Sequence, residues 1–147
     1  MSTRKITFGL LVLSLIGSGV GYLMTNSYQF NLCNSDVVNK VFDVSCHGFY
    51  ERIGDPLWYG MPALALVFFV LLFVPSAFTA WKKFAIWFVP LATLLFIFYP
   101  SPGSGDYFSP YPKQVFQWVS CLYVIVSAII IIAKSRHHNL PMVINKQ

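Results

Sequence analysis

Four long apolar runs dominate this sequence, and no charged residue interrupts any of them. The runs cover about Ile6–Met24, Leu57–Trp81, Phe84–Tyr99 and Val115–Ala133. A helix needs about 20 apolar residues to cross the ~30 Å hydrocarbon core of a bilayer, and each run is close to that length. We therefore predict an all-α membrane protein, built as a bundle of four transmembrane helices.

The composition excludes an ordinary soluble domain. Hydrophobic residues make up 56% of the 147 residues and charged residues only 10%, whereas about 25% of the residues in a soluble domain are charged. The polar segments between the runs are too short to form a separate soluble domain. We therefore predict a single integral membrane domain over residues 1–147, with the lipid bilayer as its principal partner.

The distribution of charge predicts how the helices are oriented. The start of the chain, the turn between the second and third runs, and the tail after the fourth run carry seven basic residues and no acidic residue: Arg4, Lys5, Lys82, Lys83, Lys134, Arg136 and Lys146. All five acidic residues lie in the other two loops, which have a net charge of −2 against +7 for the basic segments. Basic residues keep short loops on the cytoplasmic side. We therefore predict that both ends are inside (N-in/C-in) and that loops 25–56 and 100–114 are outside.

The partners and the location follow from the same pattern. Basic residues beside helix ends favour anionic lipid headgroups, and we expect no binding of nucleic acid. The outer loops contain no Asn-x-Ser/Thr glycosylation site, which is typical of a bacterial protein. We expect a multi-pass protein of a cell membrane, the bacterial inner membrane in particular.

The first run carries two pairs of small residues at helical spacing. Gly17 and Gly21 form a G-x-x-x-G motif, and Ser14 and Ser18 form a similar pair one position round the helix. Small residues let two helices approach closely in lipid. We expect these four residues to pack this helix inside the bundle or, alternatively, against another membrane subunit. The run of about 19 residues exceeds the ~7–15 of a signal peptide, so we expect it to be retained rather than cleaved.

The first outside loop is predicted to contain a short amphipathic helix. Asn34, Ser35 and Asp36 have side chains that can cap a first helical turn. Apolar residues follow at helical spacing at positions 37, 38, 41 and 42. A helix with one apolar face would lie on the membrane surface. A tight turn is expected at Trp81–Lys83, between the second and third spans.

Several large aromatic residues flank the apolar runs. Amphipathic rings settle at the level of the lipid headgroups. The residues that we expect at these interfaces are Trp58, Tyr59, Trp81, Tyr107, Tyr111 and Trp118.

Cys33 and Cys46 both lie in the first outside loop, and in an oxidising compartment two such thiols usually pair. A disulfide that closes a loop of this size can stabilise a fold by roughly 3 kcal/mol. A structural disulfide is the interpretation that we favour, with a redox-active pair or two unpaired thiols as the alternatives. Cys121, within the fourth run, is expected to pack as a small hydrophobic residue.

This layout is similar to that of four-span disulfide-generating membrane proteins of the DsbB and vitamin K epoxide reductase type. They also have four spans, inside termini and cysteines in the first outside loop. The resemblance implies a thiol-disulfide oxidoreductase as an alternative function. The chain departs from this family because it contains no C-x-x-C motif and no cysteine in its second outside loop.

Few residues in the sequence indicate an enzyme or a transporter. No Asp, Glu, Lys, Arg or His lies within an apolar run, whereas ion-coupled transporters keep such residues inside the membrane. Cys46 and His47, even with Cys33 and Asp43, do not form a recognisable set of zinc ligands. We expect no catalytic residue, no metal and no cofactor. The prediction is a small polytopic membrane protein, a non-enzymatic structural or accessory component that meets other membrane subunits. The alternatives are the oxidoreductase and a passive small-solute channel.

Overall fold

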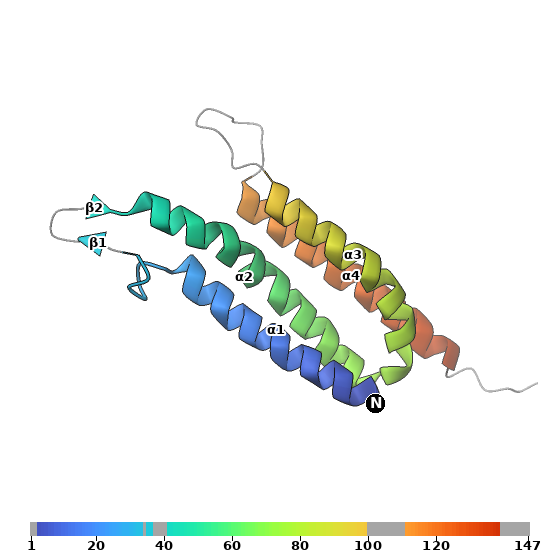
Figure 1. Ribbon diagram of the computed structural model, residues 1–147. Coiled ribbons are helices and arrows are strands. Elements are labelled where there is room, and N and C mark those ends of the chain that lie inside the picture. The colour runs from blue at the N-terminus through green and yellow to red at the C-terminus, as the bar shows by residue number, and fades with distance from the viewer. Residues whose placement is uncertain (1–2, 34, 37–40, 100–110, 139–147) are drawn as a thin grey trace, which may run out of the picture.

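The computed structural model of this chain describes residues 3–33, 35–36, 41–99 and 111–138. Among these residues, the four main helices are α1 Thr3–Thr25, α2 Val44–Phe73, α3 Phe78–Phe98 and α4 Pro112–His138 (Figure 1). All four are long and apolar enough to cross a membrane, which confirms the prediction of four such helices. The beginning of α1 and the end of α4 lie at the same end of the bundle (Figure 1).

The turn between α2 and α3 lies earlier than predicted. Helix α2 ends at Phe73, and the short 3-10 helix η1 (Pro75–Ala77) leads into α3. A proline disfavours the helical conformation of the residue before it, and Val74 has φ −123° and ψ 66°. The prediction of a turn at Trp81–Lys83 was wrong, because these residues lie in the first turns of α3. The expected spans 57–81 and 84–99 are therefore replaced by helices over 44–73 and 78–98.

Helix α2 also begins earlier than predicted, at Val44 rather than near Leu57. The side chain of Asp43 caps it by accepting a hydrogen bond of 3.0 Å from the backbone N–H of Cys46. At 1.5 Å per residue, its 30 residues extend over roughly 45 Å. Helix α2 is therefore longer than the ~30 Å needed to cross the hydrocarbon core.

The segment before α2 contains a short β-hairpin. Strands β1 (Ser35–Asp36) and β2 (Val41–Phe42) pair antiparallel, with Ser35 opposite Phe42. The expected amphipathic helix would have covered residues 34–42. Of these, the described residues form the two strands, and residues 34 and 37–40 lie outside the described part of the chain.

A disulfide flanks the hairpin. The Cα atoms of Cys33 and Cys46 are 5.8 Å apart. The disulfide therefore holds together the two ends of the segment in which β1 and β2 pair.

Helices α1 and α2 pack closely through small residues. A Cβ atom added to Gly21 would lie 2.6 Å from the backbone nitrogen of Trp58, and one added to Gly17 would lie 3.0 Å from Cγ of Met61. The Ser14 side chain is buried, and its Oγ donates a hydrogen bond of 2.8 Å to the carbonyl of Leu10. Ser18 makes the same kind of bond, from its Oγ to the carbonyl of Ser14. The structure thus places Gly17 and Gly21 against α2, within the bundle.

Trp81 lies in the core near the end of the bundle where α1 begins. Its ring packs edge-on against Phe68 of α2, with ring centroids 5.3 Å apart. Its Nε1–H donates a hydrogen bond of 3.2 Å to Oγ of Ser127 in α4. We expected Trp81 at the membrane interface, but only 4% of it is exposed. The early start of α3 accounts for this, because it places Trp81 on the helical face that packs against α2 and α4.

Candidate functional site

The end of the bundle where the hairpin lies, named the outer end here after its place in the predicted topology, holds an ionic network that joins α2 to α4. Nζ of Lys113 lies 2.6 Å from Oε1 of Glu51 and 3.7 Å from Oδ2 of Asp55. Thr25, at the end of α1, donates a hydrogen bond of 3.2 Å to Oδ1 of Asp55. Asp55 is only 4% exposed, and a carboxylate at such a site needs a charge partner and hydrogen bonds. It receives them from α4 and α1, so the network ties three helices together.

His47 extends this network towards the turn after α1. Its Nδ1 lies 2.7 Å from Oγ of Ser27, its Nε2 lies 3.9 Å from Oε2 of Glu51, and its ring stacks on Tyr28. Serine, histidine and glutamate are the residue types of a hydrolytic triad. However, Ser27 is 0% exposed, so its hydroxyl cannot reach a substrate carbonyl. The contacts instead hold the turn over residues 26–32 against α2.

The predicted pairing of Cys33 with Cys46 is confirmed. Their sulfur atoms lie at disulfide distance, 2.06 Å apart. Cys33 is buried, Cys46 is half-buried, and Cys121 has an exposed side chain on α4. Because the chain contains three cysteines, this pairing leaves a single thiol.

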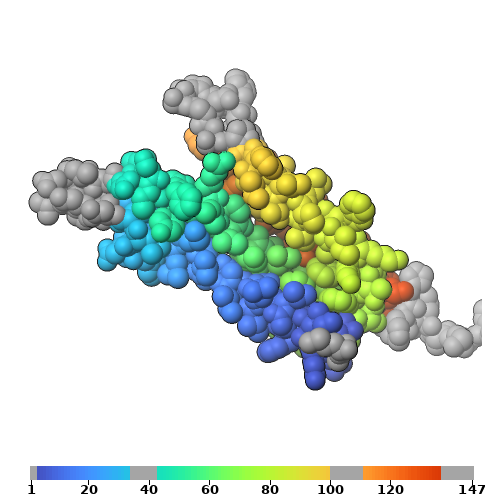
Figure 2. All heavy atoms as spheres, in the orientation of Figure 1, coloured from blue at the N-terminus to red at the C-terminus, as the bar shows by residue number. Residues whose placement is uncertain are grey.

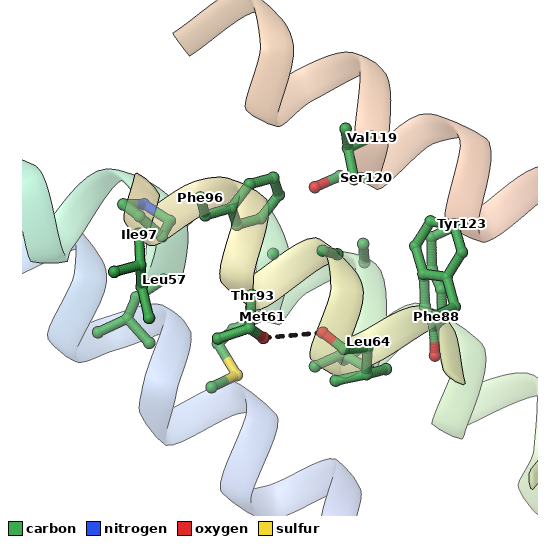
Figure 3. A pocket seen from close by; sticks show the side chains of 15 residues that line it. Leu57, Met61, Leu64, Phe88, Thr93, Phe96, Ile97, Val119, Ser120 and Tyr123 are labelled. Atoms are coloured by element: carbon green, nitrogen blue, oxygen red, sulfur yellow. Dashed lines mark hydrogen bonds between the residues drawn. The ribbon is translucent and has the colours of Figure 1, made fainter. Parts of the chain in front are cut away.

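An apolar cavity of about 200 Å³ lies between α2, α3 and α4 (Figure 3). We call it the inner cavity. Its walls include Met61 and Leu64 of α2, Phe96 and Ile97 of α3, and Ser120 of α4. Ile97 is 52% exposed, so the cavity reaches the surface of the bundle. Figure 2 shows a hollow between α2 and α3 through which atoms of α4 are visible.

Two hydroxyl groups in the inner cavity differ in their hydrogen bonding. Oγ1 of Thr93 donates a bond of 2.8 Å to the carbonyl of Val89, drawn as the dashed line in Figure 3. Oγ of Ser120 is buried and has no hydrogen-bond partner among the described residues. A buried hydroxyl without a partner costs about 1–3 kcal/mol. Ser120 therefore offers a bound molecule a polar atom that the protein itself leaves unused.

A second, larger cavity of about 890 Å³ lies at the outer end, and we call it the outer groove. It is lined by four charged residues and by aromatic rings: Glu51, Arg52, Asp55 and Lys113, with Phe96, Phe98, Tyr99, Tyr111 and Phe116 among the rest. The guanidinium of Arg52 forms no ion pair with any described residue. Phe96 lines both cavities, so the outer groove adjoins the inner cavity.

The remaining aromatic residues expected at the interface have different exposures. Trp58, Tyr111 and Trp118 are exposed, and Tyr59 is half-buried. Tyr107 lies outside the described residues. The structure therefore leaves three of these rings, but not that of Trp81, open to the surroundings of the bundle.

The ionic network escaped the sequence prediction, although its spacing was visible. His47, Glu51 and Asp55 are four residues apart, and side chains at that spacing lie on one face of a helix. The sequence does not predict a helix as far back as position 44, so it does not indicate that the three residues share a face. The partners from other helices, Thr25 and Lys113, have no such signal in the sequence.

Comparisons with known proteins do not place this chain in a family. No family model, curated protein or solved structure matches it. The function must therefore be inferred from the geometry of the chain itself.

Proposed function

We propose that this chain is a non-enzymatic accessory protein of a cell membrane, with both ends in the cytoplasm and the disulfide on the outside. The observation that carries this proposal is the bridge that Lys113 forms to Glu51 and Asp55. The charged groups of the outer end thus hold helices together. In an enzyme, such groups would instead be free to contact a substrate. We place the protein in the bacterial inner membrane.

The placement of charge in the fold supports this orientation. Arg4 and Lys5 lie in the first turn of α1, and Lys82 and Lys83 lie early in α3. These segments share one end of the bundle, opposite the hairpin (Figure 1). Basic residues at helix ends favour the cytoplasmic side, so the end that carries the acidic network faces outwards.

Helix α3 offers the surface through which we propose that another membrane subunit packs. Trp87, Leu91 and Phe98 are among the most exposed large apolar residues of the bundle, with Trp87 81% exposed. Helices in lipid associate by close packing rather than by the hydrophobic effect. A partner on this surface would therefore be another transmembrane helix.

The geometry favours this structural role over the two alternatives. Thiol-disulfide exchange requires a thiolate to reach a sulfur atom of the bond. Cys33 is only 3% exposed, which leaves the half-buried Cys46 as the one sulfur open to attack. A channel requires a path that water or solute can follow, whereas the walls of the inner cavity are predominantly apolar. The disulfide is therefore proposed to stabilise the outer loop.

Replacing Cys33 and Cys46 together by serine tests the proposal, with Cys121→Ser as the matched control. We expect the double variant to lose cellular abundance and thermal stability, while the cysteines of other exported proteins remain as oxidised as before. The control should behave like the unaltered protein. If exported proteins accumulate free thiols while the double variant keeps its normal abundance, the oxidoreductase interpretation replaces this one.

A further inference from the structure

We propose that the outer groove and the inner cavity together bind one phospholipid with a zwitterionic headgroup that ends in a primary ammonium. The headgroup lies in the outer groove, and the first part of one acyl chain lies in the inner cavity, whose volume of about 200 Å³ holds only part of a chain. This inference does not depend on the accessory role proposed above.

The two cavities form one site because they share a wall. Phe96 lines both, and the consecutive residues Asp55 and Pro56 line one cavity each. The ring of Phe96 packs against that of Phe116, with centroids 4.6 Å apart, at the boundary between them. A charged compartment that borders an apolar one matches a molecule with a charged head and an apolar tail.

The charges in the outer groove match a zwitterion. Glu51 and Asp55 carry two negative charges, and Arg52 and Lys113 carry two positive charges, so the described lining of the groove is neutral. The guanidinium of Arg52 is not engaged in an ion pair within the described structure, and its planar fork of donors suits a phosphate. We assign Arg52 to the lipid phosphate.

Glu51 is the group that we assign to the ammonium. Its side chain is 34% exposed, and although its Oε1 lies 2.6 Å from Nζ of Lys113, its Oε2 has only the more distant Nε2 of His47, at 3.9 Å. The side chain of Asp55 is 6% exposed and is held by Thr25 and Lys113. A primary ammonium has three N–H donors for a carboxylate. A choline headgroup has no N–H donor, and a glycerol headgroup brings a net negative charge towards the two carboxylates. Both should therefore bind less tightly than an ethanolamine headgroup.

The inner cavity suits the chain of the same lipid. Apart from its few hydroxyl groups, its lining consists of apolar side chains, and the exposed Ile97 marks where it opens to the surface. Ser120 lies seven residues after Lys113 on α4, which places it roughly 10 Å deeper along the helix axis. Its unpartnered Oγ is available to an ester oxygen of the lipid.

Lipid titration of the full chain tests the headgroup assignment. The protein is purified in detergent, stripped of lipid, and titrated with phosphatidylethanolamine, phosphatidylcholine or phosphatidylglycerol, and bound lipid is counted by native mass spectrometry. We expect one phosphatidylethanolamine per chain, bound about tenfold more tightly than the other two lipids. Arg52→Gln should weaken this binding about tenfold. Arg136→Gln, the same change at the opposite end of α4, should not alter it.

A second pair of variants tests the chain compartment. Ala92→Phe fills the inner cavity and should abolish tight binding. Gly60→Ala is the milder variant, because its added Cβ would lie 3.6 Å from Cε2 of Phe96, which is an ordinary contact. It should narrow the cavity and weaken binding severalfold without lowering the thermal stability of the lipid-free protein.

Three results would overturn the proposal. The first is that the three lipids bind equally tightly and that Arg52→Gln and Arg136→Gln bind lipid to the same extent. The bound lipid would then be the non-specific lipid that coats any membrane protein. Unchanged binding in both Ala92→Phe and Gly60→Ala would remove the inner cavity from the site. Displacement of the lipid by millimolar soluble phosphoethanolamine would show that a free headgroup is sufficient, and that the site does not recognise a lipid.

Discussion

Nζ of Lys113 lies 2.6 Å from Oε1 of Glu51, so the first turn of α4 is joined to the outer part of α2. The same ammonium lies 3.7 Å from the buried carboxylate of Asp55. A single basic side chain therefore serves two acidic residues one helical turn apart. This makes Lys113 the residue at which the outer end can be weakened most selectively.

Lys113→Met should destabilise the protein because it leaves Asp55 buried without its cation. The side chain of Lys113 is 46% exposed, so solvent screens part of the interaction, and we expect a loss of about 1 kcal/mol. Thermal unfolding in detergent measures it. Lys134→Met, on the same helix, is the control and should change nothing measurable. Adding Asp55→Asn to Lys113→Met should restore part of the stability, and failure to do so would mean that the carboxylate does not need the cation.

Gly21→Ala should separate α1 from α2. Its Cβ would lie 2.6 Å from the backbone nitrogen of Trp58 and 2.9 Å from the carbonyl carbon of Leu57. Backbone atoms cannot move aside as side chains can, so we expect a loss of about 1–3 kcal/mol. Gly19→Ala is the matched control, because nothing lies within 4 Å of its added Cβ. If the two variants unfold at the same temperature, the close contact between these helices is contradicted.

Trp81→Phe should lower the free energy of unfolding by about 1–3 kcal/mol, since it replaces the buried indole with a smaller ring and removes the hydrogen bond to Ser127. Trp87→Phe, at a position that is 81% exposed, should have little effect. A double-mutant cycle with Ser127→Ala isolates the hydrogen bond. A coupling energy of zero in that cycle would show that the indole N–H contributes through packing alone.

Labelling of intact cells tests the orientation. In a Cys121→Ala background, cysteine is introduced in place of the exposed Val44 or the exposed Lys83, and a membrane-impermeant maleimide is added. We expect the label at position 44 and not at position 83, because basic residues are retained inside. Permeabilised cells, in which both positions should react, provide the control. The reverse labelling pattern would invert the topology and move the disulfide to the cytoplasm.

The sequence predicted the parts of this fold that depend on local pattern. Apolar runs of spanning length gave the four helices, and two cysteines in one loop gave the disulfide between Cys33 and Cys46. Both signals are strong. A segment in lipid must satisfy its backbone hydrogen bonds internally, which favours a helix, and two cysteines in an oxidising compartment usually pair.

The errors arose where one residue or one contact overrides a local pattern. Hydropathy continues unbroken through Pro75, so only the restraint that proline places on Val74 revealed the true turn. The ionic network depends on contacts between Thr25, Asp55 and Lys113, which lie on three different helices. The residue pattern within one segment cannot predict contacts between helices.

The disulfide between Cys33 and Cys46, next to the N-terminal cap of α2, has a consequence for biogenesis. Oxidants that join cysteines act outside the cytoplasm, so in the orientation proposed above a newly made chain closes this loop only after it has been translocated. Copies inserted the wrong way round would keep reduced thiols and an open segment before Val44. Proteases on the cytosolic face could then remove the inverted molecules and spare those that had inserted correctly.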